Sequence, residues 1–408
     1  MFRKVLYIAF IVMAISCNTS RNAVGGAGAA PDNSSAENAA TDPMAAAKNT
    51  TATKSAWGGL LGEACRQMNM ENICLSPMSV QFALSMIANG AEGITKKEIC
   101  EAMQIGDDAN RHYRAFLDNL DNKYCEVKIA NSIWIKEKFD VKQKFIDTNK
   151  VFFDAQVEKT EFNDAAVERI NNWCKENTNG KIPSIIERFN ENDRMLLLNA
   201  LHFKAAWDKP FQENNTANKK FTTEKGEEIT VPTMMMRSNE LFYKDDVLAM
   251  TSKRLQFGYS MLFVLPNEGV KCDEAAVHLA NNLDTFLKNM EVRNLTLSLP
   301  KFRTEFSRSL RPILEKLGIK RAFGNRAQFN GISDDPLFIS DIIQKTYIDV
   351  NEKGTEAAAV TAMFAGALSM RPPQIEVITF DRPFIYAIVK EDNNEVIFAG
   401  KVGNPSIK

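Results

Sequence analysis

Histidine is scarce in this sequence, which has His112, His202 and His278 among 408 residues. None of the three has a cysteine or a second histidine at the spacing of a zinc motif, and no two of the seven cysteines lie closer than nine residues. A structural metal site is therefore not expected, and no other pattern indicates a cofactor. We expect His202, in an alternating apolar run, to be a core residue, and His112 and His278, in polar helical segments, to face solvent.

The sequence also lacks the short motifs of common enzymes. It contains no G-x-S-x-G, no H-E-x-x-H, no Walker loop, no G-x-G-x-x-G and no EF-hand spacing, so we do not expect an enzyme. Basic and acidic side chains, 50 and 51 in number, give a formal charge of −1. The basic excess of a general nucleic-acid-binding protein is therefore missing. With 45% hydrophobic residues the chain can nevertheless bury a large core.

No apolar run near the N terminus is long enough for a membrane-spanning helix. Arg3 and Lys4 precede an uncharged run of twelve residues from Val5 to Ser16. Twelve helical residues span about 18 Å, against about 30 Å for the hydrocarbon core of a bilayer. The pattern favours a secretory signal peptide.

The end of this run resembles the lipobox of bacterial lipoproteins, because the small residues Ala14-Ile15-Ser16 directly precede Cys17. The resemblance implies a lipoprotein-type signal over 1–16 and lipidation of Cys17. It also implies secretion across the inner membrane and a lipid anchor in the periplasm or at the outer membrane or cell surface of a bacterium. The alternative is an ordinary signal peptide with a chance cysteine, since Ala14 stands where leucine is usual.

The segment after Cys17 reads as a flexible linker. Residues 18–55 are rich in Ala, Asn, Ser, Thr and Gly and contain no aromatic residue, so they cannot bury enough apolar surface to offset their ordering entropy. A flexible chain of 38 residues reaches roughly 35 Å, enough to hold a domain clear of the lipid headgroups. We therefore expect the protein to contact the membrane only through the lipid anchor.

The six later cysteines permit disulfides, but their irregular spacing favours free, buried thiols.

From Ala56 onward the composition is even, which indicates one domain over 56–408. Ser76 and Pro77 provide a cap and an early-helix proline for a helix that stops at Asn89-Gly90. Helices first and antiparallel strands later predict an α+β fold. Further expected helices are 93–103, 109–120, 142–149, 164–177 and 307–318. Expected strands are 127–135, 195–207, 260–266, 294–302, 341–350, 374–380, 384–390 and 396–402.

Residues 352–371 form an unusual segment, with no charge between Glu356 and Arg371. Its alanines would suit a short buried helix. Every second residue from Thr355 is mostly small, however, so one face could enter a packed sheet. The segment could therefore be an exposed loop that can also become a strand.

Several motifs follow one another along residues 56–408: NICLSPMSVQFALSMIANGAEG (72–93), INNWCKENTNGKI (170–182), NALHFKAAWDKPF (199–211), LPKFRTEF, LEKLGIKRAF, AQFNGIS, EKGTEAAA, FDRPF and FAGKVGNP. In their kind and their order they resemble the motifs of the serpin family over the whole of 56–408. The resemblance implies N-terminal helices packed on a large, mostly antiparallel central sheet, with further sheets and an exposed reactive-centre loop. It also implies a monomer that forms a covalent complex with a target serine protease as a suicide substrate.

The same resemblance assigns roles to individual residues. Ser76, Ser79 and Asn199 match the shutter beneath the opening sheet, and Trp207 matches the breach. Gln344 is a departure, since the family typically has histidine there. Glutamine also offers a donor and an acceptor, so we expect the hydrogen bonds to survive without their pH sensitivity.

The loop hinge indicates an inhibitor. Non-inhibitory carriers and chaperones of the family often have bulky or charged hinges, whereas the hinge here is mostly small: Glu352, Gly354, Thr355, Ala357, Ala358 and Ala359. A mostly small hinge can enter the central sheet without burying a charge or a bulky side chain.

Two ways of counting place the reactive bond differently. Counting 17 residues from Glu352 gives Leu368–Ser369, whereas counting back from Phe380 gives Met370–Arg371. We favour the first, because the mechanism constrains insertion length. Leu368 suits elastase- or chymotrypsin-like serine proteases. The alternatives are cross-class inhibition of papain-like cysteine proteases, a non-inhibitory serpin-fold binding protein, and a lipid-anchored structural protein.

Overall fold

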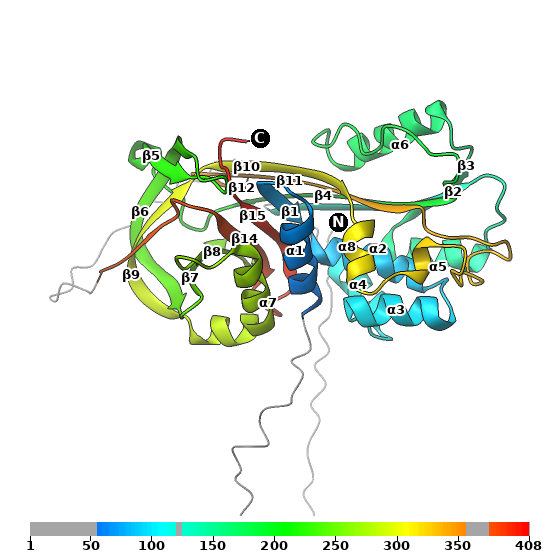
Figure 1. Cartoon of the computed structure of the whole chain (residues 1–408), viewed down its shortest axis with the longest axis horizontal. Coiled ribbons are helices and arrows are strands. Elements are labelled where there is room, and N and C mark those ends of the chain that lie inside the picture. Colours follow the sequence, from blue (N-terminus) through cyan, green and yellow to red (C-terminus); the bar gives the residue numbers. More distant parts are fainter. Residues whose placement is uncertain (1–54, 120–124, 356–374, 408) are drawn as a thin grey trace, which may run out of the picture. The chain divides into compact units, whose positions relative to one another are not determined.

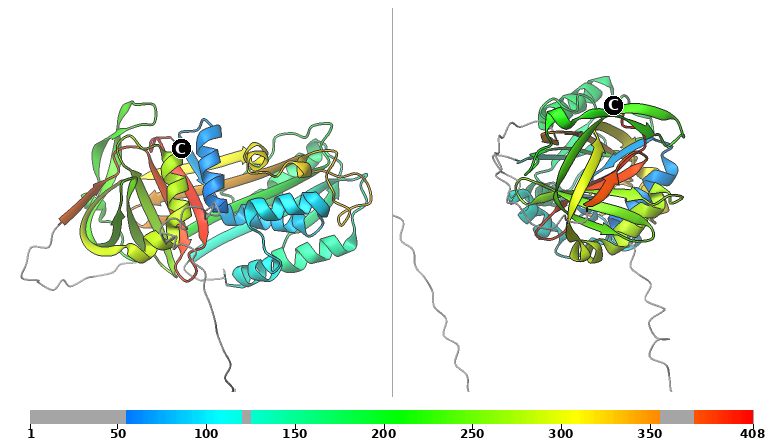
Figure 2. Two further views of the ribbon diagram at one scale, coloured as in Figure 1. Left: turned by 60° about the horizontal axis from the view of Figure 1, so that its bottom comes forward. Right: turned by 90° about the vertical axis from the view of Figure 1, so that its left-hand side faces the viewer.

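The computed structural model describes residues 55–119, 125–355 and 375–407 (Figures 1 and 2). Its α-helices are α1 (Ala56–Gln67), α2 (Pro77–Ala88), α3 (Gly93–Met103), α4 (Ala109–Asp118), α5 (Gln143–Phe153), α6 (Asp164–Asn177), α7 (Cys272–Asn289) and α8 (Arg311–Lys316). Short 3₁₀ turns lie at Glu213–Asn215 and Arg321–Phe323.

The central sheet has six strands in the order β10 (Phe302–Ser309), β11 (Asp341–Asn351), β12 (Gly354–Thr355), β4 (Met195–Ala206), β2 (Cys125–Lys136) and β3 (Gln156–Thr160). Most of its neighbours are antiparallel. The exceptions are β2 with β3 and the direct pairing of β11 with β4.

A second sheet has nine strands. Eight follow the order β1 (Asn72–Leu75), β15 (Val396–Val402), β14 (Phe384–Lys390), β8 (Tyr259–Pro266), β7 (Leu248–Leu255), β6 (Glu228–Lys244), β9 (Glu291–Pro300) and β13 (Ile375–Thr379). The ninth, β5 (Ala217–Thr222), pairs with β6. The α+β fold with a mostly antiparallel central sheet is as the sequence predicts.

Helix α2 lies against the central sheet and begins where its capping signals predict. The Ser76 Oγ accepts a hydrogen bond of 3.2 Å from the Ser79 backbone N–H, and Pro77 occupies the first turn. Nearly every residue of α2 is buried. The helix is therefore held by packing on all sides, which fixes the position of Ser76 beneath the sheet.

The central sheet is covered on both faces, with α2 and α6 on opposite sides (Figure 1). Alternate residues of β4 belong to different hydrophobic clusters: Leu197 packs with the α2 side, and Leu198 packs with Trp173 of α6. Burial on both faces explains why β4 begins with the continuous apolar run Met195–Leu198.

Two expectations for the segment around Lys301 are wrong. The strand expected over 294–302 is two strands, β9 and β10, divided at Lys301. The helix expected over 307–318 is confined to the six residues of α8, because β10 continues to Ser309 and pairs with β11. From Phe302 to Phe306, buried and more exposed side chains alternate with the period of two that is typical of a β-strand.

Candidate functional site

Strands β4 and β11 are neighbours at the centre of the six-stranded sheet. Seven residue pairs join them in parallel, from Asp341 to Tyr347 of β11. Beyond Tyr347, the two-residue strand β12 lies between them and pairs with both. The sheet is thus closed over most of its length and already divided at one end.

Gln344 joins these two strands to the start of α2. Its Oε1 accepts a hydrogen bond from the Ser76 N–H at 3.0 Å, and its Nε2 donates to the Ser76 carbonyl at 3.0 Å and to Asn199 Oδ1 at 3.0 Å. The side chain is fully buried. Glutamine thus acts as both donor and acceptor, and no charge changes with pH in these bonds.

The cluster continues onto β2 through an asparagine that the sequence did not single out. Asn199 Nδ2 donates to Asn131 Oδ1 at 2.8 Å, and these two residues face each other in the β2–β4 pairing. Ser79, also fully buried, contributes its backbone N–H to the Ser76 cap. The structure therefore gathers Ser76, Ser79, Asn199 and Gln344 into one buried polar cluster.

Trp207 lies at the divided end of the sheet and holds the chain that follows β11. Its indole Nε1 donates to the Asn351 carbonyl at 2.9 Å, and its backbone N–H donates to the Lys353 carbonyl at 3.0 Å. The side chain is 1% exposed. Trp207 therefore fixes the turn from which the loop departs.

A buried lysine packs against this tryptophan. Lys253 Nζ lies 5.6 Å from the Trp207 ring centroid and 4.8 Å from that of Phe211, with Glu240 Oε1 4.0 Å away. The Lys253 side chain is 2% exposed. Desolvation lowers the pKa of this ammonium to about 8, because nearby Glu240 only partly offsets the loss of water.

Glu352, the first hinge residue, is held by a lysine from the segment between β9 and β10. Lys301 Nζ lies 2.9 Å from Glu352 Oε2, and Thr216 Oγ1 donates to Oε1 at 2.8 Å. Burial alone would raise the pKa of this carboxyl, but the hydrogen bonds from Lys301 and Thr216 outweigh it and lower the pKa below its ordinary value.

Gly354 and Thr355 form β12, where the backbone passes very close to β4. Gly354 has φ of 151°, and a Cβ there would lie 2.2 Å from the Ala205 carbonyl oxygen, so only glycine fits. Thr355 is fully buried. Its Oγ1 accepts from the Ala205 N–H at 2.9 Å and donates to the Ala205 carbonyl at 3.2 Å.

Several predicted residues lie outside the described part of the chain. They are the lipidation residue Cys17, the hinge alanines Ala357, Ala358 and Ala359, and the reactive-bond residues Leu368 and Ser369. Conversely, Asn131, Lys253 and Lys301 belong to the site although no motif singled them out. The sequence gives one indication of Asn131, namely that it is an asparagine within the largely apolar segment 127–135.

The three histidines differ in their surroundings. His202 is buried in β4, as expected, with its ring centroid 6.2 Å from that of Tyr347. His112 is exposed, as expected, and also contacts Glu395. His278 is only half-exposed, because its Nε2 lies 2.8 Å from Asp245 Oδ2. Within the described ranges, no three His, Cys, Asp or Glu side chains form a metal-binding group.

Five described cysteines are free thiols, as the sequence predicts. Cys74 and Cys174 are buried, whereas Cys65, Cys100 and Cys272 are half-buried. Burial raises the pKa of each of these thiols above its ordinary value. None of them is therefore an activated nucleophile.

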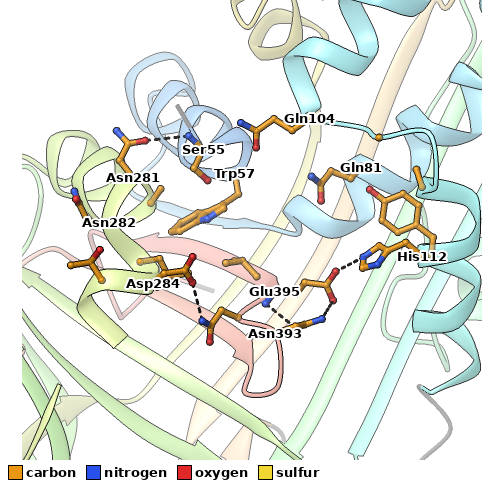
Figure 3. A pocket seen from close by; sticks show the side chains of 18 of the residues that line it. Ser55, Trp57, Gln81, Gln104, His112, Asn281, Asn282, Asp284, Asn393 and Glu395 are labelled. Atoms are coloured by element: carbon orange, nitrogen blue, oxygen red, sulfur yellow. Dashed lines mark hydrogen bonds and ion pairs between the residues drawn. The ribbon is translucent and has the colours of Figure 1, made fainter. Parts of the chain in front are cut away.

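A polar cavity of about 610 Å³ lies among α1, α4, α7 and the turn after β14 (Figure 3). Trp57 and Tyr113 contribute aromatic rings to its lining. Three carboxylates and six carboxamides complete the polar lining: Asp108, Asp284, Glu395, Gln81, Gln104, Asn281, Asn282, Asn393 and Asn394. Among the described residues, no lysine or arginine lines it. The cavity is therefore suited to a neutral or cationic polar molecule.

Residues 58–405 match the family described as Serpin (serine protease inhibitor). An uncharacterised serpin-like protein of Thermococcus kodakarensis is 32% identical over 354 residues, which cover 83% of this chain and 82% of the relative. Alpha-1-antichymotrypsin of Homo sapiens is 30% identical over 350 residues, covering 82% of this chain and 83% of the relative.

Solved structures agree with these relatives. The native state of the thermophilic serpin tengpin superposes with a TM-score of 0.79 at 30% identity, covering 91% of this chain and 96% of tengpin. A complex of thyroxine-binding globulin with thyroxine gives a TM-score of 0.77 at 27% identity, covering 87% and 99%. In the described residues, no helix is long and apolar enough to cross a membrane. The chain belongs to the serpin family.

Proposed function

We propose that this protein inhibits serine proteases as a suicide substrate. A protease attacks the loop after β12 and forms an acyl-enzyme, and the cleaved loop enters the central sheet between β11 and β4 with the protease attached. Insertion must be faster than hydrolysis of the acyl bond. One observation carries the proposal: Gly354 and Thr355 already occupy the first positions of the new strand.

The register of β12 defines the path of the inserted strand. Thr355 pairs antiparallel with β4, so each later loop residue would face one earlier residue of β4. Ala365 would then face Met195, where β4 begins. The next residues would serve as a spacer at the far end of the sheet, which supports a reactive bond at Leu368–Ser369.

The face that would become buried is small. Side chains alternate along a strand, so Ala357, Ala359 and Thr361 would share the buried side of Thr355. Glu356 and Ala358 would lie on the other face, where Glu356 would pair with half-buried Lys204 of β4. Insertion would therefore desolvate no charge on the face occupied by Thr355.

Insertion exchanges one set of strand contacts for a larger one. The seven parallel pairs between β4 and β11 must separate, together with the bond between Gln344 and Asn199. The new strand then pairs with both neighbours in antiparallel fashion, in the register that β12 begins. A net gain of backbone hydrogen bonds favours the inserted state.

We also propose targets and location. Leu368 suits the apolar primary pocket of elastase- or chymotrypsin-like enzymes, and papain-like cysteine proteases are a second class because they too form acyl-enzymes. Residues 1–16 act as a signal, Cys17 carries lipid, and residues up to 55 tether a monomeric domain in the periplasm or at the outer membrane or cell surface. Loss of fatty-acid labelling in Cys17→Ser tests the anchor.

The test is a protease panel with the mature protein. Elastase, chymotrypsin, trypsin and papain are each incubated with it, and denaturing gels and sequencing of the released C-terminal peptide follow. We expect an SDS-stable complex with elastase or chymotrypsin and a new N terminus at Ser369. Complete loop cleavage by every enzyme, without complex or rise in melting temperature, would contradict inhibition.

The polar cavity favours a second candidate function, that of a small-molecule binding protein. One structural neighbour is a complex of thyroxine-binding globulin with thyroxine, so the fold is compatible with a bound small molecule. Here Trp57 offers a ring and Asp284 a carboxylate to a polar aromatic or cationic ligand. Quenching of tryptophan fluorescence by such a ligand, lost in Trp57→Phe and weakened in Asp284→Asn, would support this function.

A further inference from the structure

We propose that Cys65 of α1 and Cys272 of α7 form a disulfide bond when the folded protein meets a small-molecule disulfide, and that this bond fastens the two helices together. Both are free thiols in the structure. The inference is independent of protease inhibition, because neither helix belongs to the central sheet.

The two helices pack unusually closely. A Cβ placed on Gly58 would lie 2.1 Å from Ala280 Cβ, and one on Gly62 would lie 2.8 Å from Val277 Cγ2. Glycines one turn apart on α1 therefore allow its backbone to approach α7. A disulfide requires such an approach, since the two Cα atoms must lie within about 7 Å.

The packing also fixes which residues face each other. Gly58 faces Ala280 and Gly62 faces Val277, so successive turns of α1 meet earlier turns of α7. One turn further, Arg66 Nη1 lies 3.4 Å from Asp273 Oδ2. The neighbouring residues at this end of the helix pair are Cys65 and Cys272.

The surroundings of the two thiols place them together independently of the helix register. Both cysteines line one cavity of about 720 Å³. The same three charged side chains, Lys401, Glu224 and Asp273, act electrostatically on both thiols. Through this cavity a small disulfide can reach either sulfur.

The two fully buried thiols, Cys74 and Cys174, are placed differently. Cys74 lies in the main hydrophobic cluster, and Cys174 lies in the cluster beneath α6 on the other side of the central sheet. These two cannot pair with each other without disrupting the sheet between them. Of these four thiols, Cys65 and Cys272 are therefore the pair that the geometry selects.

The reaction balances with the added disulfide as oxidant. The thiolate of one cysteine attacks a sulfur of the small disulfide, which releases one thiol and leaves a mixed disulfide on the protein. The second thiolate then attacks the protein sulfur of the mixed disulfide and releases the second thiol. Two protons leave the cysteines, and two electrons reduce the added S–S bond.

The rate should depend steeply on pH. Burial raises the pKa of Cys65 to about 12 and also raises the pKa of Cys272. Glu224 and Asp273 raise both pKa values and Lys401 lowers both, while Arg66 lowers that of Cys65 and Cys65 raises that of Cys272. The attacking thiolate is therefore rare at neutral pH, and below the thiol pKa its fraction rises about tenfold per pH unit. Bond formation in the folded protein should be slow at pH 7 and accelerate accordingly.

The experiment treats the purified full chain with oxidised glutathione at pH 7.0, 8.0 and 9.0. Free thiols are then alkylated, and the tryptic peptides are analysed by mass spectrometry without reduction. We expect a peptide linked through Cys65 and Cys272, formed faster at each higher pH. The melting temperature should rise by several degrees, because the cross-link closes a long loop.

Serine variants provide the controls. Cys65→Ser and Cys272→Ser should each abolish the linked peptide and the rise in melting temperature, whereas Cys100→Ser, at another half-buried thiol, should change neither. Mapping of the wild-type chain needs no variant to fold. Recovery of both cysteines as free or singly glutathionylated residues, or linkage of either to another cysteine, would overturn the bond. An unchanged melting temperature would overturn the fastening of α1 to α7.

Discussion

Gln344 Nε2 on β11 donates a hydrogen bond of 3.0 Å to Asn199 Oδ1 on β4, and the two residues also face each other in the parallel pairing of these strands. The bond therefore crosses the seam at which a new strand would enter. Because the same amide also holds both backbone groups of Ser76, one side chain joins the seam to α2.

Replacing Gln344 with alanine should destabilise the closed sheet. The Asn199 side chain and the Ser76 backbone would lose buried partners, and each unsatisfied buried group costs about 1–3 kcal/mol. We expect a lower free energy of unfolding in urea for Gln344→Ala. Gln143→Ala serves as the control, since Gln143 bonds to Asp147 at the exposed surface. Equal stability of Gln344→Ala and wild type would contradict this role.

Gln344→His should introduce a pH dependence that the wild-type residue does not have. A buried imidazole is favoured in its neutral form, so its folded-state pKa falls below the ordinary value of about 6.5. The unfolded chain then binds a proton that the folded chain does not, and stability is lost as the pH falls through 6.5. Unfolding at pH 5.5 and 8.0 should separate this variant from wild type only at the lower pH.

The Glu352–Lys301 pair predicts a loss of stability in acid. Because the folded-state pKa of Glu352 lies below its ordinary value of 4.5, the carboxylate contributes fully above pH 4.5, and this contribution is lost as the pH falls through the folded-state pKa. Glu352→Gln should therefore lower the free energy of unfolding at pH 7 by about 1 kcal/mol.

This difference between wild type and Glu352→Gln should shrink as the solution is acidified below pH 4.5. Glu213→Gln is the matched control, because Glu213 pairs with Lys353 at 3.5 Å but is 68% exposed. If the stability difference between wild type and Glu352→Gln stays constant from pH 7 to pH 3, Glu352 stabilises the fold through its shape rather than through its charge.

The fold could be predicted from the sequence wherever a segment carries its own signals. Ser76 and Pro77 mark the start of α2, and the apolar run of β4 is long enough to stand out. Strands β5, β6 and β7 were not predicted, and β6 shows why. It mixes Met235 with Arg237 and Glu240, and its strand character depends on pairing with its neighbours β5 and β7 and with β9, which is distant in the sequence.

The candidate site divides in the same way. The positions of Ser76, Asn199 and Gln344 followed from motifs, and the structure brings their side chains together. The contacts of Lys301 and Lys253 could not be predicted. Each lysine reaches its partner only because separate strands converge at the divided end of the sheet, and no local pattern encodes that convergence.

The buried Lys253 predicts a second pH dependence, in alkaline solution. Its folded-state pKa of about 8 lies below the ordinary value of 10.5, so between these values the unfolded chain retains a proton that the folded chain has lost. Stability should therefore rise with pH across this window. Lys253→Met should exceed wild type by about 1–3 kcal/mol at pH 7 and by less at pH 10.

Urea unfolding at both pH values checks this prediction. Lys97→Met is the control, since Lys97 is 68% exposed and should show no such convergence with wild type. If the stability difference between Lys253→Met and wild type is the same at pH 7 and pH 10, then keeping the Lys253 ammonium charged in the folded protein does not lower its stability, and the prediction is wrong.

Gly354→Ala should displace β12. The added Cβ would lie 2.2 Å from the Ala205 carbonyl oxygen at a φ of 151°, and neither the backbone of β4 nor the hinge can move away easily. Limited proteolysis should then cut faster within residues 352–360. Gly226→Ala isolates the cost of positive φ alone, because Gly226 has φ of 82° and open space around it. Equal proteolysis of the two variants would contradict a tight hinge.

Thr355→Arg should convert the inhibitor into a substrate. Thr355 is fully buried and bonded to Ala205, so an arginine there must either desolvate its guanidinium or keep the strand out of the sheet. Thr355→Val is the control, because it keeps the shape and removes only the hydroxyl. Denaturing gels after incubation with elastase or chymotrypsin should show covalent complex for wild type and Thr355→Val, and only cleaved chain for Thr355→Arg. Undiminished complex with Thr355→Arg would mean that insertion does not begin at β12, and the register derived from Thr355 would then lose its basis.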